Sequence, residues 1–188
     1  MAGEPRVREA IALVETISVA VGVRVADEMA KQAPVELLEA TPICPGKYMV
    51  LAAGDVASVE SSLKRGIEVG GDVVVDTLFI PNVHQQVFPA ILAASGVTAL
   101  GALGVLETFT AASAIRCADA AAKAARVSLI EIRLAKGLGG KAFFTMTGEV
   151  HEIEAAMEAA LAIARSGGNL VRSVVIPRPH EAVGPKVL

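Results

Sequence analysis

The 188-residue sequence has no tryptophan, one tyrosine and five phenylalanines, so it is poor in aromatic side chains. It therefore lacks the platforms on which unpaired nucleic-acid bases stack. It also lacks any block of lysine and arginine, and its formal net charge is −3. Since nucleic-acid binding depends on a basic surface that neutralises phosphates, we expect no nucleic-acid partner.

Cysteine is scarce as well, and no targeting segment is recognisable. Cys44 and Cys117 lie far apart, which does not suggest a disulfide framework, and a reducing cytoplasmic setting is expected. The first ten residues are charged and have no apolar core of the kind found in secretory signals. Residues 87–106 carry no charge and have spanning length, but Pro89 and three glycines interrupt them, so we expect no membrane span.

What the chain does have is small aliphatic residues. Hydrophobic residues make up 53% of the sequence and charged residues 20%. This is more apolar than is usual for a soluble domain. The surplus indicates burial against other subunits in addition to burial inside the fold.

The sequence also repeats itself. LVET at residues 13–16 matches VLET at 105–108, and Gly46-Lys47 matches Gly140-Lys141. Farther along, Gly54-Asp55-Val56 matches residues 148–150, and Ile80-Pro81 with His84 matches residues 176–180. The spacing between matched residues grows along the chain, which indicates two short insertions in the second copy, one near Gly137 and one in or after its second helix.

Each copy carries the same predicted order of elements: strand, helix, strand, strand, helix, strand. In the first copy the strands are predicted at 10–16, 35–40, 48–53 and 73–80, with a loop at 41–47. The helices are predicted at 21–33 and from residue 56, where Asp55 supplies an N-cap, to Gly70-Gly71. This order predicts an α+β fold in two tandem ferredoxin-like domains, each an antiparallel sheet with helices on one face. We place the first domain at 10–92, a linker at 93–103 and the second domain at 104–182.

Several motifs together resemble a known family. SVVIPRPH at 173–180, GVLET at 104–108 and GEV at 148–150 resemble the signature of the bacterial microcompartment shell (BMC) domain, and LVET, GDV and IPNVH match it more loosely in the first copy. The resemblance is to the non-permuted tandem class. It implies a homotrimer that forms a pseudo-hexameric disc, and discs that tile with other shell proteins into the microcompartment shell around encapsulated redox enzymes. It also implies that the chain is not itself an enzyme.

The resemblance assigns roles to residues at the edge of such a tile. Lys31 and Lys123 resemble the edge lysine that meets its neighbour across adjoining tiles. Arg178 matches the edge arginine of the family, whereas Asn82 stands in its place in the first copy and weakens that contact.

The resemblance further implies that the loop between the second and third strands of each copy lines a central pore. The two loops differ in sequence, since the first is flanked by prolines and the second is rich in glycine. The expected pore-lining residues are Ile43, Cys44, Pro45 and Gly46 in the first loop, and Gly137, Leu138, Gly139 and Gly140 in the second.

Cys44 is the candidate metal ligand. One thiolate cannot hold an iron–sulfur cluster, but a residue near a three-fold axis occurs three times. The ICPGK loop resembles that of the propanediol-utilisation branch of tandem shell proteins, which implies one 4Fe-4S cluster per trimer, ligated by Cys44 from three chains. Cys117 lies among alanines and is predicted to be a buried small hydrophobe.

Three alternatives stay open at this stage. The tile can lack a cluster and simply pass metabolites through its pore. The fold can instead serve a trimeric regulator that senses a small molecule, because fold does not fix function. An enzyme would need Cys44 as nucleophile and a histidine as base, but neither a third orienting group nor an oxyanion motif is recognisable.

Overall fold

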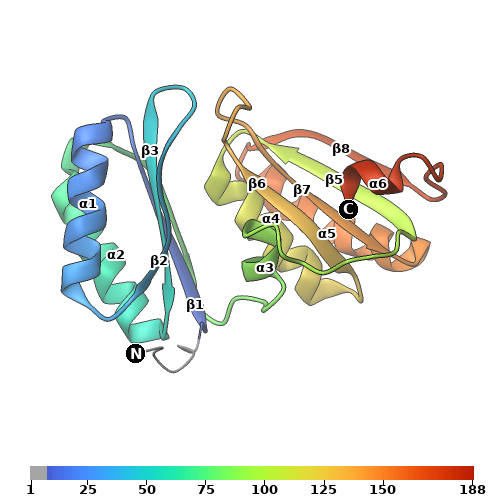
Figure 1. The fold of residues 1–188 in the computed structure, drawn as a ribbon, viewed down its shortest axis with the longest axis horizontal. Coiled ribbons are helices and arrows are strands. Elements are labelled where there is room, and N and C mark those ends of the chain that lie inside the picture. Colours follow the sequence, from blue (N-terminus) through green and yellow to red (C-terminus); the bar gives the residue numbers. More distant parts are fainter. Residues whose placement is uncertain (1–7) are drawn as a thin grey trace. The chain divides into compact units, whose positions relative to one another are not determined.

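The computed structural model describes residues 8–188, which form two compact units that meet in sequence at Val83 and His84. Each unit contains one four-stranded antiparallel sheet with helices packed against it (Figure 1). The predicted α+β class and the order of elements are therefore confirmed. None of the helices between residues 8 and 188 combines the length and apolar character that crossing a bilayer requires.

The first unit has the strand order β2-β3-β1-β4, with all neighbours antiparallel. Helices α1 and α2 pack against each other and against the sheet. In chain order its elements are β1 (Ala10–Thr16), α1 (Val19–Gln32), β2 (Glu36–Ile43), β3 (Lys47–Gly54), α2 (Val56–Gly70), the 3-10 turn η1 (Gly71–Val73) and β4 (Val74–Ile80).

The helices of the first unit begin at polar caps, as short side chains that accept a backbone N–H favour. Asp55 accepts a hydrogen bond of 2.9 Å from the backbone N–H of Ser58, which confirms the predicted cap of α2. Ser18 accepts one from Val21, so α1 begins two residues before the predicted start. Gly71 ends α2 with a φ of 56°, a left-handed backbone angle that glycine adopts without strain.

One expectation for the first unit is wrong. Residues 41–47 were expected to form a loop, but β2 continues through Pro42 and Ile43. The reason is that β2 is an edge strand, where a proline costs no ladder hydrogen bond on its open side.

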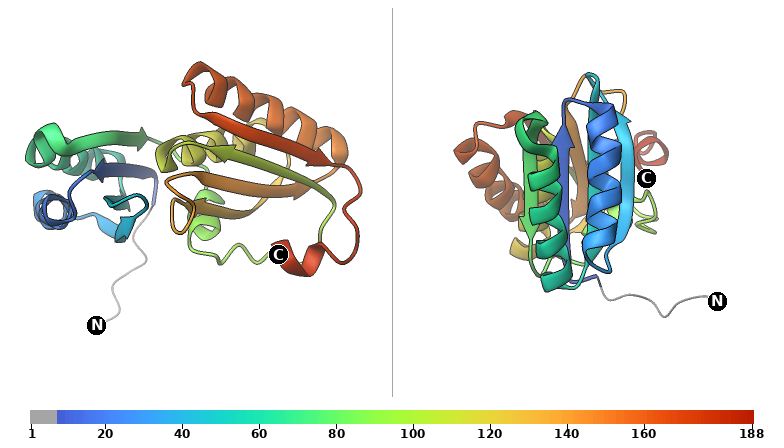
Figure 2. Two further views of the ribbon diagram at one scale, coloured as in Figure 1. Left: turned by 90° about the horizontal axis from the view of Figure 1, so that it is seen from above. Right: turned by 90° about the vertical axis from the view of Figure 1, so that its left-hand side faces the viewer.

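The second unit repeats the design, with the strand order β6-β7-β5-β8. Helices α4 and α5 pack against each other and against the sheet, while α6 lies on the opposite side of the sheet from α5 (Figure 2). In chain order its elements are α3 (Val87–Ile91), β5 (Ala102–Thr108), α4 (Ala111–Ala124), β6 (Ser128–Leu134), β7 (Ala142–Gly148), α5 (Val150–Ser166), β8 (Leu170–Ile176) and α6 (Gly184–Val187).

Irregularities of the two sheets recur at matching positions, which supports the internal repeat. The ladder shifts register after Glu15 in β1 and after Glu107 in β5, and again between Leu37 and Glu39 in β2 and between Leu129 and Glu131 in β6. The predicted insertions are also present. The turn between β2 and β3 has three residues whereas the β6–β7 loop spans 135–141, and α5 has 17 residues where α2 has 15.

The cores of the two units are filled by different combinations of large and small residues. A Cβ on Gly22 of α1 would lie 2.5 Å from the Tyr48 ring, so the ring needs this glycine. At the same helix position and the same register position, the second unit has Ala114 and Ala142. A glycine beside a large side chain in one unit thus stands where the other unit has two alanines.

Two further pairs follow the same pattern. Gly66 makes room for the Met29 thioether, and Ala160 and Ala121 stand at the corresponding helix positions. In the sheets, Ala12 faces Ala52 in the first unit, whereas Gly104 faces Met146 in the second.

The segment that follows β4 packs with the second unit. Helix α3 packs on β6 and α4, with Val87, Phe88, Ala90 and Ile91 buried. The predicted first domain, 10–92, includes residues 84–92. The division at Val83 instead follows the side on which these residues are buried.

Candidate functional site

A tight turn joins β2 to β3 and carries Cys44. Ile43 and Lys47 pair across the end of the ladder, and Cys44, Pro45 and Gly46 form the turn between them. Gly46 has a φ of 68°, as the last residue of a three-residue hairpin commonly does. Ile43 is buried, the Cys44 side chain is partly exposed, and Pro45 and Gly46 are exposed, so the thiol sits at the tip of a short, closed hairpin.

The loop between β6 and β7 is longer and built on glycine. Gly137, Gly139 and Gly140 have φ values of 72°, 62° and 91°, which residues with a Cβ rarely adopt. The backbone N–H of Lys141 donates to the carbonyl of Leu138 at 3.2 Å and closes the loop. Gly137 and Gly139 are exposed, Leu138 is half-buried and Gly140 is buried.

In the first unit, the turn and the predicted edge residues lie at opposite ends of the sheet. The turn follows the end where Thr16 of β1 pairs with Tyr48. Helix α1 starts near that end and runs back to Lys31 in its last turn, close to where β2 begins opposite Ala53. Asn82 follows Ile80, which pairs with Ile11 near the start of β1. The unit therefore has a loop end and an edge end.

The second unit likewise has a loop end and an edge end. Its loop follows the end where Thr108 pairs with Ala142, whereas Lys123 is in the last turn of α4 and Arg178 follows Ile176. Arg178 and Asn82 are both exposed, and Asn82 has a φ of 54°.

Both predicted edge lysines form the same ion pair one helical turn back. Lys123 donates to Asp119 at 2.7 Å, and Lys31 donates to Asp27. The hydrogen bond with Asp27, followed by its charge, raises the pKa of Lys31 above its usual value. The lysine side chains are 67% and 44% exposed for Lys31 and Lys123, so both ammonium groups remain accessible from outside the helix.

A second repeated ion pair, which was not predicted, lies at the loop end of each unit. The Lys47 ammonium lies 3.0 Å from the Glu15 carboxylate, which is 1% exposed, and the second oxygen of Glu15 has no partner among residues 8–188. In the second unit Lys141 lies 3.3 Å from Glu107, but those side chains are 48% and 39% exposed. The glutamates belong to the LVET and VLET repeats and the lysines to the Gly-Lys repeat. The recurrence of both motifs in each copy is the sequence feature from which this pair could have been predicted.

The residues that pair with these two glutamates on the neighbouring strand differ in the sign of their charge. Glu15 pairs in register with Asp76 on β4, and Glu107 pairs with Arg172 on β8. Directly opposed residues of an antiparallel pair point to the same face. The loop end of the first unit therefore carries two carboxylates beside Lys47, and that of the second unit carries Arg172 beside its own glutamate and lysine.

The other candidate chemical groups are engaged in structural roles. Cys117 is fully buried, as predicted, and burial raises the pKa of its thiol to about 11. The imidazoles of His84 and His180 each accept a backbone N–H two residues ahead, at 3.4 Å and 3.2 Å, so each histidine stabilises a local turn. Within residues 8–188 no three His, Cys, Asp or Glu side chains come together in a way that would hold a metal ion.

Comparison with known proteins identifies the fold family. The model of the BMC domain matches twice, at residues 10–83 and 102–179. The chain is similar to the bacterial microcompartment shell protein PduT of Citrobacter freundii, with 39% identity over 93% of this chain and 95% of that protein. It is also similar to the shell protein EutM of Salmonella typhimurium, with 42% identity over 42% of this chain and 80% of that protein.

A solved structure extends the likeness over both repeats. A crystal structure of a microcompartment protein from Desulfitobacterium hafniense DCB superposes with a TM-score of 0.91 at 49% identity, covering 95% of this chain and 99% of that chain. The internal repeat of the sequence, the presence of one four-stranded sheet in each unit and these matches all indicate two copies of one domain. The chain therefore belongs to the BMC domain family of bacterial microcompartment shell proteins, and it carries two copies of that domain in tandem.

Proposed function

We propose that three copies of this shell protein form a pseudo-hexameric tile, with the six loop ends around a central pore and the six edge ends at the rim. The polarity of both units supports this arrangement, because each sheet separates its loop from its lysine and from Asn82 or Arg178. A closed ring of repeated units is also a common form of oligomer. Other shell proteins of the same compartment are the partners at the rim.

We further propose that Cys44 from three chains ligates one 4Fe-4S cluster at the pore. The observation that carries this proposal is the position of a partly exposed thiol at the tip of a three-residue turn. The chemistry of the donor fits, since cysteine thiolates hold such clusters. One chain offers only one such thiol, because Cys117 is buried inside its helix layer, so three copies are needed and the fourth iron takes another ligand.

A cluster in this position would supply one-electron redox chemistry to the tile. The surrounding residues would fix its place: the Ile43–Lys47 pair closes the hairpin, and the Lys47–Glu15 ion pair ties the third strand to the first. Encapsulated redox enzymes are the partners that such a centre would serve, by electron transfer across the shell or by redox sensing.

Iron and acid-labile sulfide, measured on anaerobically purified protein, test the cluster. We expect about one cluster per three chains, its loss in Cys44→Ser, and its retention in the matched control Cys117→Ala. Wild-type protein that binds no iron after anaerobic reconstitution refutes the cluster and leaves a tile with a metabolite pore.

Electron microscopy of purified protein tests the tile itself. We expect extended sheets from the wild type. Lys31→Asp combined with Lys123→Asp should abolish the sheets and leave trimers in solution, because it reverses the charge at the rim of both units. A wild type that stays a discrete trimer and binds a small molecule saturably points instead to a sensing regulator. Intact sheets in the double variant refute the edge assignment.

A further inference from the structure

The segment that follows the last strand is itself repeated. Residues 84–92 read HQQVFPAIL and residues 180–188 read HEAVGPKVL, with histidine, valine, proline and leucine at the same spacing. Both segments start with a histidine whose imidazole accepts a backbone N–H two residues ahead, and both contain a short helix, α3 or α6. They are thus two copies of one structural element.

The first copy is firmly seated. The backbone N–H of His84 donates to the Asp119 carboxylate at 2.7 Å. The Gln86 side chain donates to the Val127 carbonyl and accepts from the Leu129 N–H, at 3.1 Å and 2.8 Å, along the edge of β6. With the apolar side of α3 also buried, the segment is held by both polar and apolar contacts.

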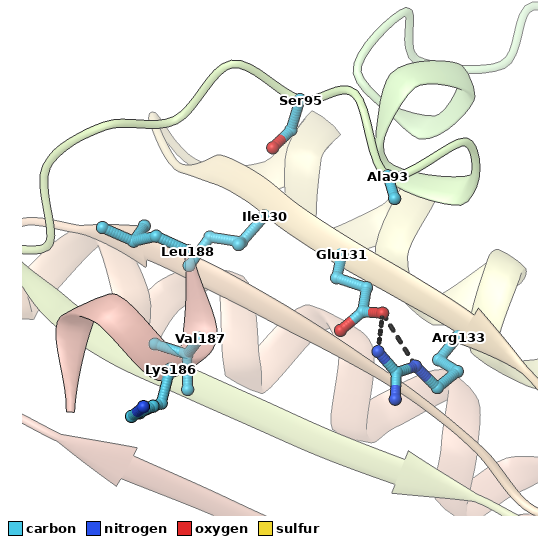
Figure 3. Close-up of a pocket in the computed structure, with 8 residues that line it drawn as sticks. All are labelled: Ala93, Ser95, Ile130, Glu131, Arg133, Lys186, Val187 and Leu188. Atoms are coloured by element: carbon cyan, nitrogen blue, oxygen red, sulfur yellow. Dashed lines mark hydrogen bonds and ion pairs between the residues drawn. The ribbon is translucent and has the colours of Figure 1, made fainter.

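The second copy is not seated in this way. Val183 and Val187 are only partly buried, although the corresponding Val87 and Ile91 are buried. Figure 3 shows Val187 and Leu188 beside Ile130 of β6, where a cavity of about 260 Å³ separates α6 from the linker and the sheet. Apolar segments in protein interiors are normally close-packed, whereas residues 186–188 border this cavity.

The first unit carries an open counterpart of the surface that receives α3. Asp27 is 55% exposed, whereas Asp119 is 10% exposed. Leu37 and Leu38 are half-buried and Ala40 is exposed, although their counterparts in β6 are buried. Asp119 and Leu129, which hydrogen-bond residues 84–92, correspond to Asp27 and Leu37 in the first unit. Ile130 and Ile132 on the strand that α3 packs against correspond to Leu38 and Ala40.

We propose that residues 180–188 of one copy dock on α1 and β2 of a neighbouring copy, as residues 84–92 dock on α4 and β6. This proposal rests on the proposed trimer, in which the last repeat of one chain adjoins the first repeat of the next. The partner is a second copy of this chain, because it offers the same receiving surface that the structure already shows in use. The segment acts as a clamp that links chains around the ring.

Part of the chemistry that holds residues 84–92 is available to residues 180–188, although Ala182 stands in place of Gln86 and cannot form its two side-chain hydrogen bonds. The backbone N–H of His180 would meet the Asp27 carboxylate, and Val183, Val187 and Leu188 would cover the apolar edge of β2. Lys186 stands where Ala90 is buried, but its long stem can lie along the surface while the ammonium reaches water. Gly184 replaces Phe88, so the clamp buries less apolar area than α3 does.

Photo-crosslinking on the full chain tests the clamp. A photo-reactive phenylalanine derivative replaces Leu188 in one variant and Leu92 in a matched control, since both side chains are 44% exposed. We expect position 188 to yield covalent dimers, with the adduct in residues 23–40 of the other copy. Position 92 should mark only residues of its own chain within 115–132. Adducts from position 188 confined to its own residues near Ile130, in a protein that is trimeric, refute the clamp.

Light scattering on the same samples separates the two proposals. A wild type that is monomeric at all concentrations refutes the trimer and with it the clamp. If the clamp is correct, Val187→Asp raises the dissociation constant of the trimer roughly tenfold or more, which corresponds to about 1.4 kcal/mol. Val187→Ile, which installs the residue of the seated segment, leaves the trimer intact. A trimer that Val187→Asp does not weaken refutes the clamp.

Discussion

The buried pair of Glu15 and Lys47 gives the sharpest test of how the loop end is stabilised. Replacing Lys47 by methionine keeps most of the side-chain length but removes the charge 3.0 Å from Glu15. The Glu15 carboxylate, which is 1% exposed, then loses the partner of its Oε2 atom. Its Oε1 atom already has no partner within residues 8–188. Leaving a buried charge without its partner typically lowers the free energy of unfolding by about 3–5 kcal/mol.

The second unit supplies the matched control. Lys141→Met removes the same kind of pair from Glu107, but there both side chains are well exposed. Water replaces the lost partner, so the expected cost is about 0–1 kcal/mol. The two variants change the same residue type at corresponding positions. The sites differ in the burial of the carboxylate and in the residue opposite it, which is Asp76 in the first unit and Arg172 in the second.

Urea denaturation and thermal melting of both variants measure the difference. We expect Lys47→Met to lose about 6–20 °C in melting temperature, because about 1 kcal/mol corresponds to roughly 2–4 °C at this chain length. Lys141→Met should stay within a few degrees of the wild type. Removing both charges with Glu15→Leu and Lys47→Met should recover much of the loss. Equal effects of the two lysine variants, or no recovery in the double variant, would show that burial of Glu15 does not control the cost.

Three smaller predictions concern other sites. Gly22→Ala should lower the free energy of unfolding by about 1–3 kcal/mol in urea titrations, because the new Cβ meets the Tyr48 ring; an unchanged midpoint would contradict the close packing. Hydrogen bonds from the Ser58 side chain and then from its backbone N–H lower the pKa of Asp55 below its usual 3.8. Their contribution to stability is therefore present above that pH and is lost as pH falls through the lowered pKa. Melting scans of Asp55→Asn should therefore depend less on acid than those of the wild type. In cluster-free protein at pH 8, thiol labelling should modify Cys44 and spare Cys117 until denaturant is added.

The order of elements could be predicted because the spacing of apolar residues and the internal repeat both indicated the same order of strands and helices. Asp55 followed by apolar residues at helical spacing marked α2, and the structure has the cap in place. The end of β2 could not be predicted in this way. Pro42 reads as a breaker in isolation, and only its position on an edge strand allows the strand to continue.

For the site, sequence motifs indicated which residues belong together but not how buried they are. The glutamate and lysine of the loop end were visible as repeated letters, yet their pairing depends on the register of β1 against β3. The burial that distinguishes Glu15 from Glu107 depends on residues distant in sequence. The helix position of Lys31 was predictable from the spacing of apolar residues, and that of Lys123 from the internal repeat. Their ion pairs with Asp27 and Asp119, one helical turn back, were not predicted.

The paired exchanges of large and small residues in the two cores bear on how a duplicated gene can drift apart. Moving from Gly22 and Tyr48 to an arrangement like Ala114 and Ala142 takes two substitutions, and either order passes through a clash or a void. Each half has thus become a set of mutually dependent residues. Recombination that exchanges single helices between the halves, or between related genes, would be selected against. Exchange of a whole half would keep its core intact, so shell-protein genes of this kind should recombine at the boundary between repeats.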